Sequence, residues 1–307
     1  MSRPIKNVVV AGATGSLGSQ ILTELDKHGG FNITVFTRKP DAAFPDGVMA
    51  KVVDFSSPTA LALALQGQDA VVDALSSPDP SVSIALIDAA VAAGVYRYIA
   101  PEFGSDPDND KTRSLPVFNG KKQVYAHLRQ AANQQKITWT AISNGAFLDW
   151  GLRVGFVKID LLKKKIELMN DGTHVFAWTT LPAIATAVAN ALVHAEKTRN
   201  MTCYIYSVQK SQKEIADLAK EALGPDGWET QSKSMGQAFE KALSAVNAGD
   251  YSWEFLGDMI RYAISTPGYS TPLEKDHNDL LGVRPMSDEQ VKVLIKEISD
   301  EMKSGPQ

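Results

Sequence analysis

The segment Val8–Gly18, with the sequence VVVAGATGSLG, constrains the fold of this chain more than any other. A run of valines ends in three glycines, Gly12, Gly15 and Gly18, and an apolar pattern with helical spacing follows at once. This arrangement predicts a strand that turns tightly into a helix. The first glycine permits the turn, the second lets backbone N–H groups approach a pyrophosphate, and the third lets the helix pack on the strand. Because the positive end of that helix faces the turn, the segment predicts a dinucleotide-binding site.

The end of the next predicted strand, residues 33–36, indicates which dinucleotide binds. In NAD-binding folds a carboxylate about 20 residues past the glycines usually accepts hydrogen bonds from the ribose hydroxyls. This chain has Thr37-Arg38-Lys39 at that place and no carboxylate. Arg38 can hold a 2′-phosphate through its planar guanidinium, and Lys39 adds a second positive charge. The predicted cofactor is therefore NADP(H).

Composition excludes several other classes of protein. The chain has 307 residues, of which 44% are hydrophobic, so it can bury the core of one large domain or two. A net charge of −4 and the lack of a basic stripe argue against a nucleic-acid partner. The single cysteine, Cys203, cannot form an internal disulfide, which is typical of a reducing compartment. No apolar run approaches the roughly 18 residues of a membrane helix, and the histidines lack metal-ligand spacing. We expect a cytoplasmic monomer or homodimer with no membrane partner and no metal.

Up to about residue 150, short apolar runs alternate with segments of helical pattern. Strands separated by helices favour βαβ units and a parallel sheet covered on both faces. The expected strands are 33–36, 50–53, 70–74, 98–100 and 139–142, and the expected helices are 17–28, 58–66, 82–93 and 121–133. The predicted fold class is α/β, a doubly wound Rossmann sheet. Ligands of such sheets bind beyond the carboxyl ends of the strands, where this chain has Asp54, Phe55, Ser76, Ser77, Glu102, Phe103, Ser143 and Asn144.

Beyond Trp150 this alternation stops. Loops and a hairpin are predicted by Gly151, Gly155, Lys163–Lys165 and the segment Asn170-Asp171-Gly172. The basic run Lys163–Lys165 is also typical of a solvated helix end. A helix is expected over 181–195 and a strand over 202–207, and capping boxes predict helices over 213–223 and 288–303. We therefore divide the chain into an NADP-binding Rossmann domain, 1–150, and a smaller α+β substrate-binding domain, 151–307. Some segments, about 181–207, can return to the Rossmann sheet.

With these motifs in place, the chain resembles the isoflavone reductase-like and NmrA-like family. This is a branch of the atypical short-chain dehydrogenases that includes the phenylcoumaran benzylic ether reductases. The resemblance rests on Gly12-Ala13-Thr14-Gly15, Thr37-Arg38, the stretch 87–99 (IDAAVAAGVYRYI), the loop 101–104 (PEFG), Lys121 and the stretch 142–147 (ISNGAF). It covers most of the first 150 residues and extends weakly to about Val193. It implies an NADPH-dependent reductase with a compact C-terminal substrate domain.

The resemblance also implies a catalytic lysine. Reductases of this family use a lysine at the start of the helix after a PSEFG-like loop as the general acid/base, and Lys121 is the matching position. A lysine near the nicotinamide can have a lowered pKa and pass a proton as hydride moves. Two departures leave alternatives open: Ala100-Pro101-Glu102 lacks the serine of the loop, and the following segment is longer than in the plant reductases. Lys122 could replace Lys121, or Tyr125 could occupy the plant lysine's position.

The predicted activity is hydride transfer from NADPH to a small aromatic or conjugated substrate, with Lys121 as the proton donor. The alternative is an NmrA-like regulatory protein that senses NADP(H) with little or no turnover. A sugar-nucleotide epimerase is disfavoured, because Tyr206 and Lys210 have the spacing of a Tyr-x-x-x-Lys pair but do not lie on a predicted helix. The expected cofactor contacts are Gly12, Thr14, Gly15, Ser16, Leu17, Gly18, Arg38, Lys39, Asp54, Phe55, Ser76, Phe103 and Lys121. The expected substrate contacts are Phe103, Asn144 and Phe147.

Overall fold

Seven parallel strands form the large sheet of the protein, in the order β11-β6-β5-β4-β1-β2-β3. The computed structural model describes residues 4–77 and 79–305. Because every pairing in this sheet is parallel, all of its strands end at one edge. The strands are β1 (Asn7–Ala11), β2 (Asn32–Thr37), β3 (Met49–Val52), β4 (Ala70–Asp73), β5 (Arg97–Ile99), β6 (Thr138–Ser143) and β11 (Met201–Tyr204).

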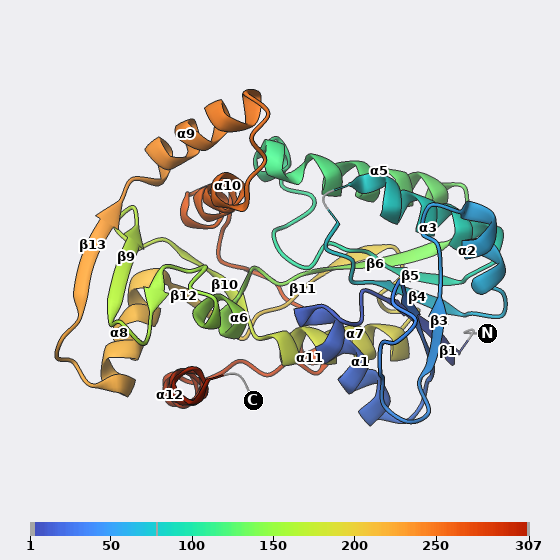
Figure 1. The fold of residues 1–307 in the computed structure, drawn as a ribbon, viewed down its shortest axis with the longest axis horizontal. Coiled ribbons are helices and arrows are strands. Elements are labelled where there is room, and N and C mark those ends of the chain that lie inside the picture. The colour runs from blue at the N-terminus through green and yellow to red at the C-terminus, as the bar shows by residue number, and fades with distance from the viewer. Residues whose placement is uncertain (1–3, 78, 306–307) are drawn as a thin grey trace.

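Helices cover both faces of this sheet, as Figure 1 shows. The alternation of side chains along β1 divides the core between the two faces: Val8 and Val10 join the cluster under α1 and α7, whereas Val9 and Ala11 join the cluster under α2, α3 and α5. The helices are α1 (Ser16–His28) and α7 (Leu181–Val193) on one face, and α2 (Pro58–Ala64), α3 (Pro80–Ala92) and α5 (Asn119–Asn133) on the other.

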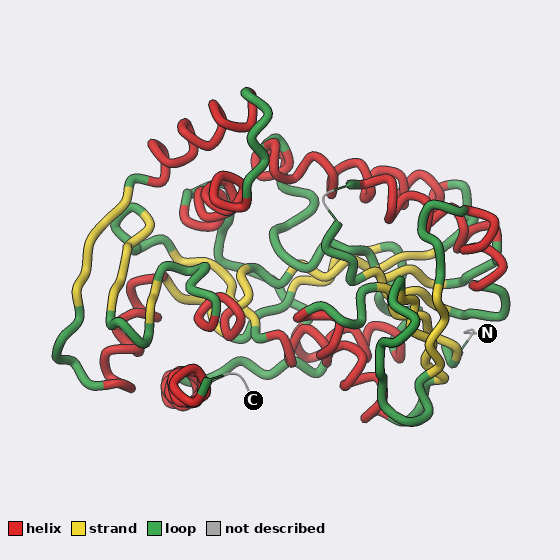
Figure 2. The backbone as a smooth tube through the Cα atoms, viewed as in Figure 1, coloured by secondary structure: helices red, strands yellow, loops and turns green. Residues whose placement is uncertain are grey.

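The C-terminal half adds two small sheets at the opposite end of the molecule from β1–β3 (Figures 1 and 2). One sheet has the order β12-β10-β7 and the other β13-β9-β8. Their strands are β7 (Ala146–Phe147), β8 (Ile159–Asp160), β9 (Lys165–Met169), β10 (Val175–Thr179), β12 (Val208–Ser211) and β13 (Glu229–Lys233). The remaining helices are α4 (Asp110–Arg113), the 3₁₀ turn η1 (Pro116–Phe118), α6 (Leu148–Arg153), α8 (Gln212–Leu223), α9 (Met235–Asn247), α10 (Trp253–Ser265), α11 (Asn278–Leu281) and α12 (Asp288–Ser304).

The sequence-based fold class, a doubly wound parallel sheet, is confirmed. Both predicted capping boxes are present, at Ser211 with Glu214 and at Ser287 with Gln290. Strand β11 lies in the large sheet beside β6, and α7 packs on α1, so segments from beyond residue 150 complete the Rossmann layer. The division of the chain at residue 150 stays a prediction.

The expectations for the C-terminal half have different outcomes. Lys163–Lys165 is not a helix end, because Lys163 and Lys164 lie in the turn of the β8–β9 hairpin and Lys165 begins β9. The expected hairpin is therefore present at this basic run, whereas Asn170-Asp171-Gly172 does not close one, since β9 pairs with β8 and β13 and β10 pairs with β7 and β12. Long-range pairing, which a local turn signal cannot reveal, decides where these strands lie.

Candidate active site

The glycine turn lies at the carboxyl edge of the large sheet, between β1 and α1. Gly12 has φ +88°, and a Cβ there would lie 2.5 Å from the carbonyl oxygen of Ala74. A Cβ on Gly18 would lie 2.0 Å from the carbonyl oxygen of Gly12, so only glycine allows α1 to pack this close to the turn. Gly15 has a different role, because its ideal Cβ would meet nothing nearer than 3.4 Å. The space above Gly15 is therefore open.

The beginning of α1 suits an anionic group. Gly15 provides no side-chain cap, and the first turn contains no acidic residue. The backbone N–H groups at this end therefore remain available to an anion. Thr14, Gly15 and Ser16 are exposed around these N–H groups, and Leu17 is half-buried. These residues fit a pyrophosphate, as the glycine spacing predicts.

Arg38 and Lys39 follow β2 beside this turn, and both are exposed. The backbone N–H of Lys39 donates to the hydroxyl of Thr37 at 3.0 Å, which fixes the end of the strand. Within residues 4–77 and 79–305, the Arg38 guanidinium has no ion pair or hydrogen bond. An unpaired guanidinium at this edge is available to a 2′-phosphate.

The other predicted cofactor contacts follow β3 and β4. Asp54 is exposed, and two hydrogen bonds from Ser56 lower the pKa of its carboxyl group. Phe55 packs partly against the core, and Ser76 is exposed. The structure therefore brings these three residues to the same edge as the glycine turn, where contact with the cofactor stays a prediction.

Lys121 lies in the first turn of α5, and its ammonium group reaches the carboxyl edge. Its Nζ donates a hydrogen bond of 2.7 Å to the carbonyl oxygen of Glu102, in the loop after β5. Burial lowers the pKa of Lys121, an effect that the positive charge of Arg113 reinforces and that the carboxylates of Glu102 and Asp73 oppose. The side chain is only partly exposed. A lysine with a lowered pKa at this edge is a candidate for proton exchange, and its catalytic role stays a prediction.

Glu102 and Arg113 form a buried ion pair next to Lys121. The side chains of Arg113 and Glu102 are 5% and 0% exposed, respectively. Glu102 lies in the loop three residues past the end of β5 and was among the strand-end residues expected at this edge. Arg113, on the short helix α4, was missed because nothing in its local sequence connects it with the loop. Only the path of the chain between β5 and α5 brings the two charges together.

Asp73, the last residue of β4, is a second buried carboxyl group at this edge. It accepts hydrogen bonds from the Tyr98 hydroxyl at 2.7 Å and from the Leu75 backbone N–H at 3.1 Å. Burial raises the pKa of Asp73 against the effect of these hydrogen bonds. Sequence analysis missed it because the predicted strand ran one residue too far, to Ala74.

The predicted substrate contacts differ in their accessibility. Phe103 is 8% exposed and Asn144 is 0% exposed, whereas Phe147 is half-buried. The side-chain amide of Asn144 donates to the Gly145 carbonyl at 3.0 Å, and its Oδ1 has no partner among the described residues. Of the three, Phe147 offers the most surface to a ligand. Contact of substrate with all three residues stays a prediction.

Phe147 begins a row of aromatic side chains, which we call the aromatic row. Its ring centroid lies 6.1 Å from that of Trp150, which lies 5.7 Å from Phe156, which in turn lies 6.0 Å from Trp253 on α10. Trp253 comes from a distant part of the chain and was not expected. Its side chain is 61% exposed, so the row runs from the sheet edge to the surface.

The two alternative proton donors, Lys122 and Tyr125, are in different surroundings from Lys121. Lys122 is exposed on α5. The Tyr125 hydroxyl lies 3.1 Å from the Thr202 hydroxyl and 3.3 Å from Asp108 Oδ2, and burial raises its pKa to about 12. A hydroxyl with this pKa is a poor proton donor near neutral pH, and its partners hold it beside β11 rather than beside Glu102.

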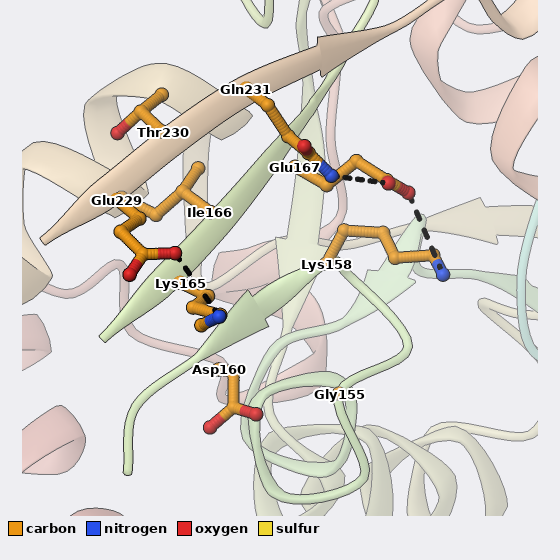
Figure 3. Close-up of a pocket in the computed structure, with 9 residues that line it drawn as sticks. All are labelled: Gly155, Lys158, Asp160, Lys165, Ile166, Glu167, Glu229, Thr230 and Gln231. Carbon is orange, nitrogen blue, oxygen red and sulfur yellow. Dashed lines mark hydrogen bonds and ion pairs between the residues drawn. The ribbon is translucent and has the colours of Figure 1, made fainter. Parts of the chain in front are cut away.

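A pocket of about 510 Å³ lies far from this edge, between β8, β9 and β13 (Figure 3). The charged side chains that line it are paired: Lys158 with Glu167 at 3.7 Å, Lys165 with Glu229 at 3.1 Å, and Asp160 with the neighbouring Lys163 at 3.8 Å. Gln231 binds the same Glu167 at 3.1 Å. Because this pocket presents no unpaired charge and none of the strand-end residues, we do not assign the site to it.

Comparisons with known proteins show the family of this chain. Residues 12–172 match the sequence profile of the NAD(P)H-binding family. The oxidoreductase aprR of Aspergillus flavus is 31% identical over 299 residues, which cover 94% of this chain and 98% of the relative. The chain belongs to the NAD(P)H-binding family. Another member, the oxidoreductase poxI of Penicillium oxalicum, is 28% identical over 306 residues, which cover 95% of this chain and 94% of that protein.

Solved structures show the same fold in this NAD(P)H-binding protein. A structure from work on pinoresinol-lariciresinol and phenylcoumaran benzylic ether reductases is 18% identical, with a TM-score of 0.75, over 97% of this chain and 100% of that one. A complex of leucoanthocyanidin reductase from Vitis vinifera with NADPH is 17% identical, with a TM-score of 0.74, over 96% and 100%. The predicted resemblance and the predicted cofactor class, NADP(H), are confirmed. The protein is an oxidoreductase, as its curated relatives are.

Membrane insertion through a helix finds no support. Across residues 4–77 and 79–305, every helix is either too short or too polar to traverse a bilayer.

Proposed function

We propose that this oxidoreductase transfers hydride from NADPH to a small aromatic or conjugated substrate, with Lys121 as the proton donor. The observation that carries the proposal is the position of the Lys121 ammonium group, bound to the Glu102 carbonyl at 2.7 Å at the edge where the glycine turn also lies. When bound, NADPH supplies the hydride. Lys121 then supplies the proton that the reduced substrate needs, so that one hydride and one proton are added together.

The electrostatics of Lys121 support this role. Its ammonium group can donate three hydrogen bonds, and among the described residues it uses one, to Glu102. The remaining N–H groups are free for a substrate oxygen. Because burial lowers the pKa of Lys121, its proton is given up more readily near neutral pH than that of an exposed lysine.

Arg38 supports NADPH over NADH. Its exposed, unpaired guanidinium follows β2, where a ribose carboxylate partner is absent. The open space above Gly15 and the uncapped start of α1 fit the pyrophosphate. Phe55 and Asp54 would flank the adenosine.

The aromatic row supports an aromatic or conjugated acceptor. Phe147, at the end of the short strand β7 that follows β6, presents a half-buried ring, and Trp150 meets it edge-on at an interplanar angle of 86°. Flat π-systems stack favourably on such rings. One solved neighbour of similar fold was crystallised with NADP+ and (+)pinoresinol, which contains aromatic rings.

The test is an assay of NADPH oxidation with quinones, enones and phenolic ethers, on the wild type and on Lys121→Ala. We expect turnover with at least one class of acceptor, its loss in Lys121→Ala, and an NADPH affinity within a few-fold of wild type. Lys122→Ala is the matched control, because it removes a neighbouring lysine that is exposed, and it should keep its turnover. Full turnover by Lys121→Ala would contradict the assignment.

The second candidate is a regulatory protein that senses NADP(H). The replacement of the loop serine of related reductases, in Ala100-Pro101-Glu102, favours it. Tight NADPH binding without turnover across the whole set of acceptors would select this candidate over the reductase.

A further inference from the structure

Glu102 connects two cations through its two ends. Its carboxylate forms the buried ion pair with Arg113, and its backbone carbonyl accepts the hydrogen bond from Lys121 Nζ at 2.7 Å. Arg113 comes from α4 and Lys121 from α5, so a single loop residue ties both helices to the end of β5. Arg113 and Lys121 are therefore linked through a single residue, Glu102.

We propose that Arg113 is a positioning residue for Lys121, which acts by clamping Glu102 so that its carbonyl holds the lysine ammonium group at the sheet edge. The inference rests on the proposed function, because it assigns how the proton donor is kept in place. Arg113 is not placed in contact with substrate or cofactor.

The burial of the pair supports this role. Glu102 Oε1 and Arg113 Nε and Nη1 are buried without partners among the described residues, so each side chain depends on the other. A fully buried carboxylate that loses its one cation is costly and has to move or take up a proton. If Arg113 is removed, the loop that carries the Glu102 carbonyl loses the ion pair that holds it in place.

The pair also sets the charge around Lys121. Three charged or titratable groups face the ammonium group from neighbouring elements: Asp73 on β4, Glu102 after β5 and Arg113 on α4. Loss of Arg113 leaves the Glu102 charge unbalanced and raises the pKa of Lys121. Loss of the Glu102 charge leaves Arg113 unbalanced and lowers it. If the pair had a purely structural role, the loss of Arg113 and the loss of the Glu102 charge would not shift the pKa of Lys121 in opposite directions.

The experiment measures the pKa of Lys121 without reference to a substrate. The full-length protein is labelled competitively with acetic anhydride across a pH series, and acetylation at each lysine is quantified by mass spectrometry. Acetylation of Lys122, which is exposed, is measured in the same sample as an internal control. The variants are Arg113→Met, Arg113→Lys, Glu102→Gln and the neutral double variant Glu102→Gln/Arg113→Met.

We expect the pKa of Lys121 to rise by about one unit in Arg113→Met and to fall by about one unit in Glu102→Gln. The double variant and Arg113→Lys should lie between these, nearer the wild type, while Lys122 stays unchanged throughout. Circular dichroism and NADPH affinity show which variants fold. If Arg113→Met fails to fold, Glu102→Gln still has to lower the pKa of Lys121 relative to both the wild type and the double variant.

Shifts of the same sign in both single variants, or no shift in folded protein, would overturn the inference. This failure is separable from failure of the proposed function. If Lys121→Ala keeps full turnover, the proton donor is wrong whatever the labelling shows. If Lys121→Ala is inactive while the pKa of Lys121 is indifferent to Arg113 and Glu102, only the positioning role is wrong.

Discussion

The two halves of this site are built in different ways. The cofactor half centres on one short local segment, Gly12–Gly18, in which Gly12 and Gly18 are each required by a close backbone approach and Gly15 leaves open space. The half that we propose faces the substrate is made by segments far apart in sequence: Phe156 meets Trp253, and Glu102 pairs with Arg113. Backbone constraints therefore make the cofactor half recognisable from a local sequence pattern. The other half is formed by side-chain contacts between distant segments, which no local pattern reveals.

The largest expected effect tests the rigidity of the cofactor half. In Gly18→Ala the new Cβ would lie 2.0 Å from the backbone carbonyl of Gly12, and backbone atoms cannot move aside as a flexible side chain can. We expect a loss of about 3 kcal/mol in the free energy of unfolding and the loss of measurable NADPH binding. Thermal unfolding and calorimetric titration with NADPH measure both.

Gly236→Ala is the matched substitution in the other half. Gly236 is also helical, on α9, and its ideal Cβ would meet nothing nearer than 3.9 Å. Stability should change by no more than about 1 kcal/mol, in either direction, with NADPH affinity unchanged. If both glycines tolerate alanine equally, the claimed difference between the halves does not hold.

The same difference explains what could be predicted from the sequence. The strand ends after β1, β2, β3 and β5 were placed well enough to bring Gly12, Arg38, Asp54 and Glu102 to one edge, because hydrophobic runs and glycines are local signals. Helices α9 and α10 were not expected, although Ser234 does cap α9 through the backbone N–H of Gln237. Arg113 and Trp253 could not be found, since each gains its role only by meeting a residue from another segment.

The second prediction concerns Arg38, the residue that we propose distinguishes NADPH from NADH. In Arg38→Ala the 2′-phosphate loses a charge-assisted hydrogen bond worth about 2 kcal/mol, so NADPH affinity should fall roughly 30-fold while NADH affinity changes little. Lys39→Ala removes a point charge beside the same phosphate and should weaken NADPH binding by only a few-fold. Titrations of both coenzymes against both variants give the answer. Equal losses for NADPH and NADH in Arg38→Ala would remove Arg38 from the phosphate site.

The smallest expected effect is on KM for the acceptor, and it follows from substitutions at the two ends of the aromatic row. Phe147 ends the short strand β7, four residues beyond the end of β6, so an acceptor near the nicotinamide should stack on its ring. In Phe147→Leu we expect KM for an aromatic acceptor to rise about fivefold, since a stacked ring contributes about 1 kcal/mol beyond its buried area. NADPH affinity should not change. The measurement is steady-state kinetics with the best acceptor from the NADPH oxidation assay.

Trp253→Leu decides how far the substrate site extends into the C-terminal half. Trp253 lies at the exposed end of the row and reaches Phe147 only through Phe156 and Trp150. If the substrate is held at the sheet edge, its KM should rise less in Trp253→Leu than in Phe147→Leu. The reverse order would mean that the acceptor lies along the row toward α10. The two halves would then share the recognition of substrate, and the distant contacts that escaped sequence analysis would be the ones that select the substrate.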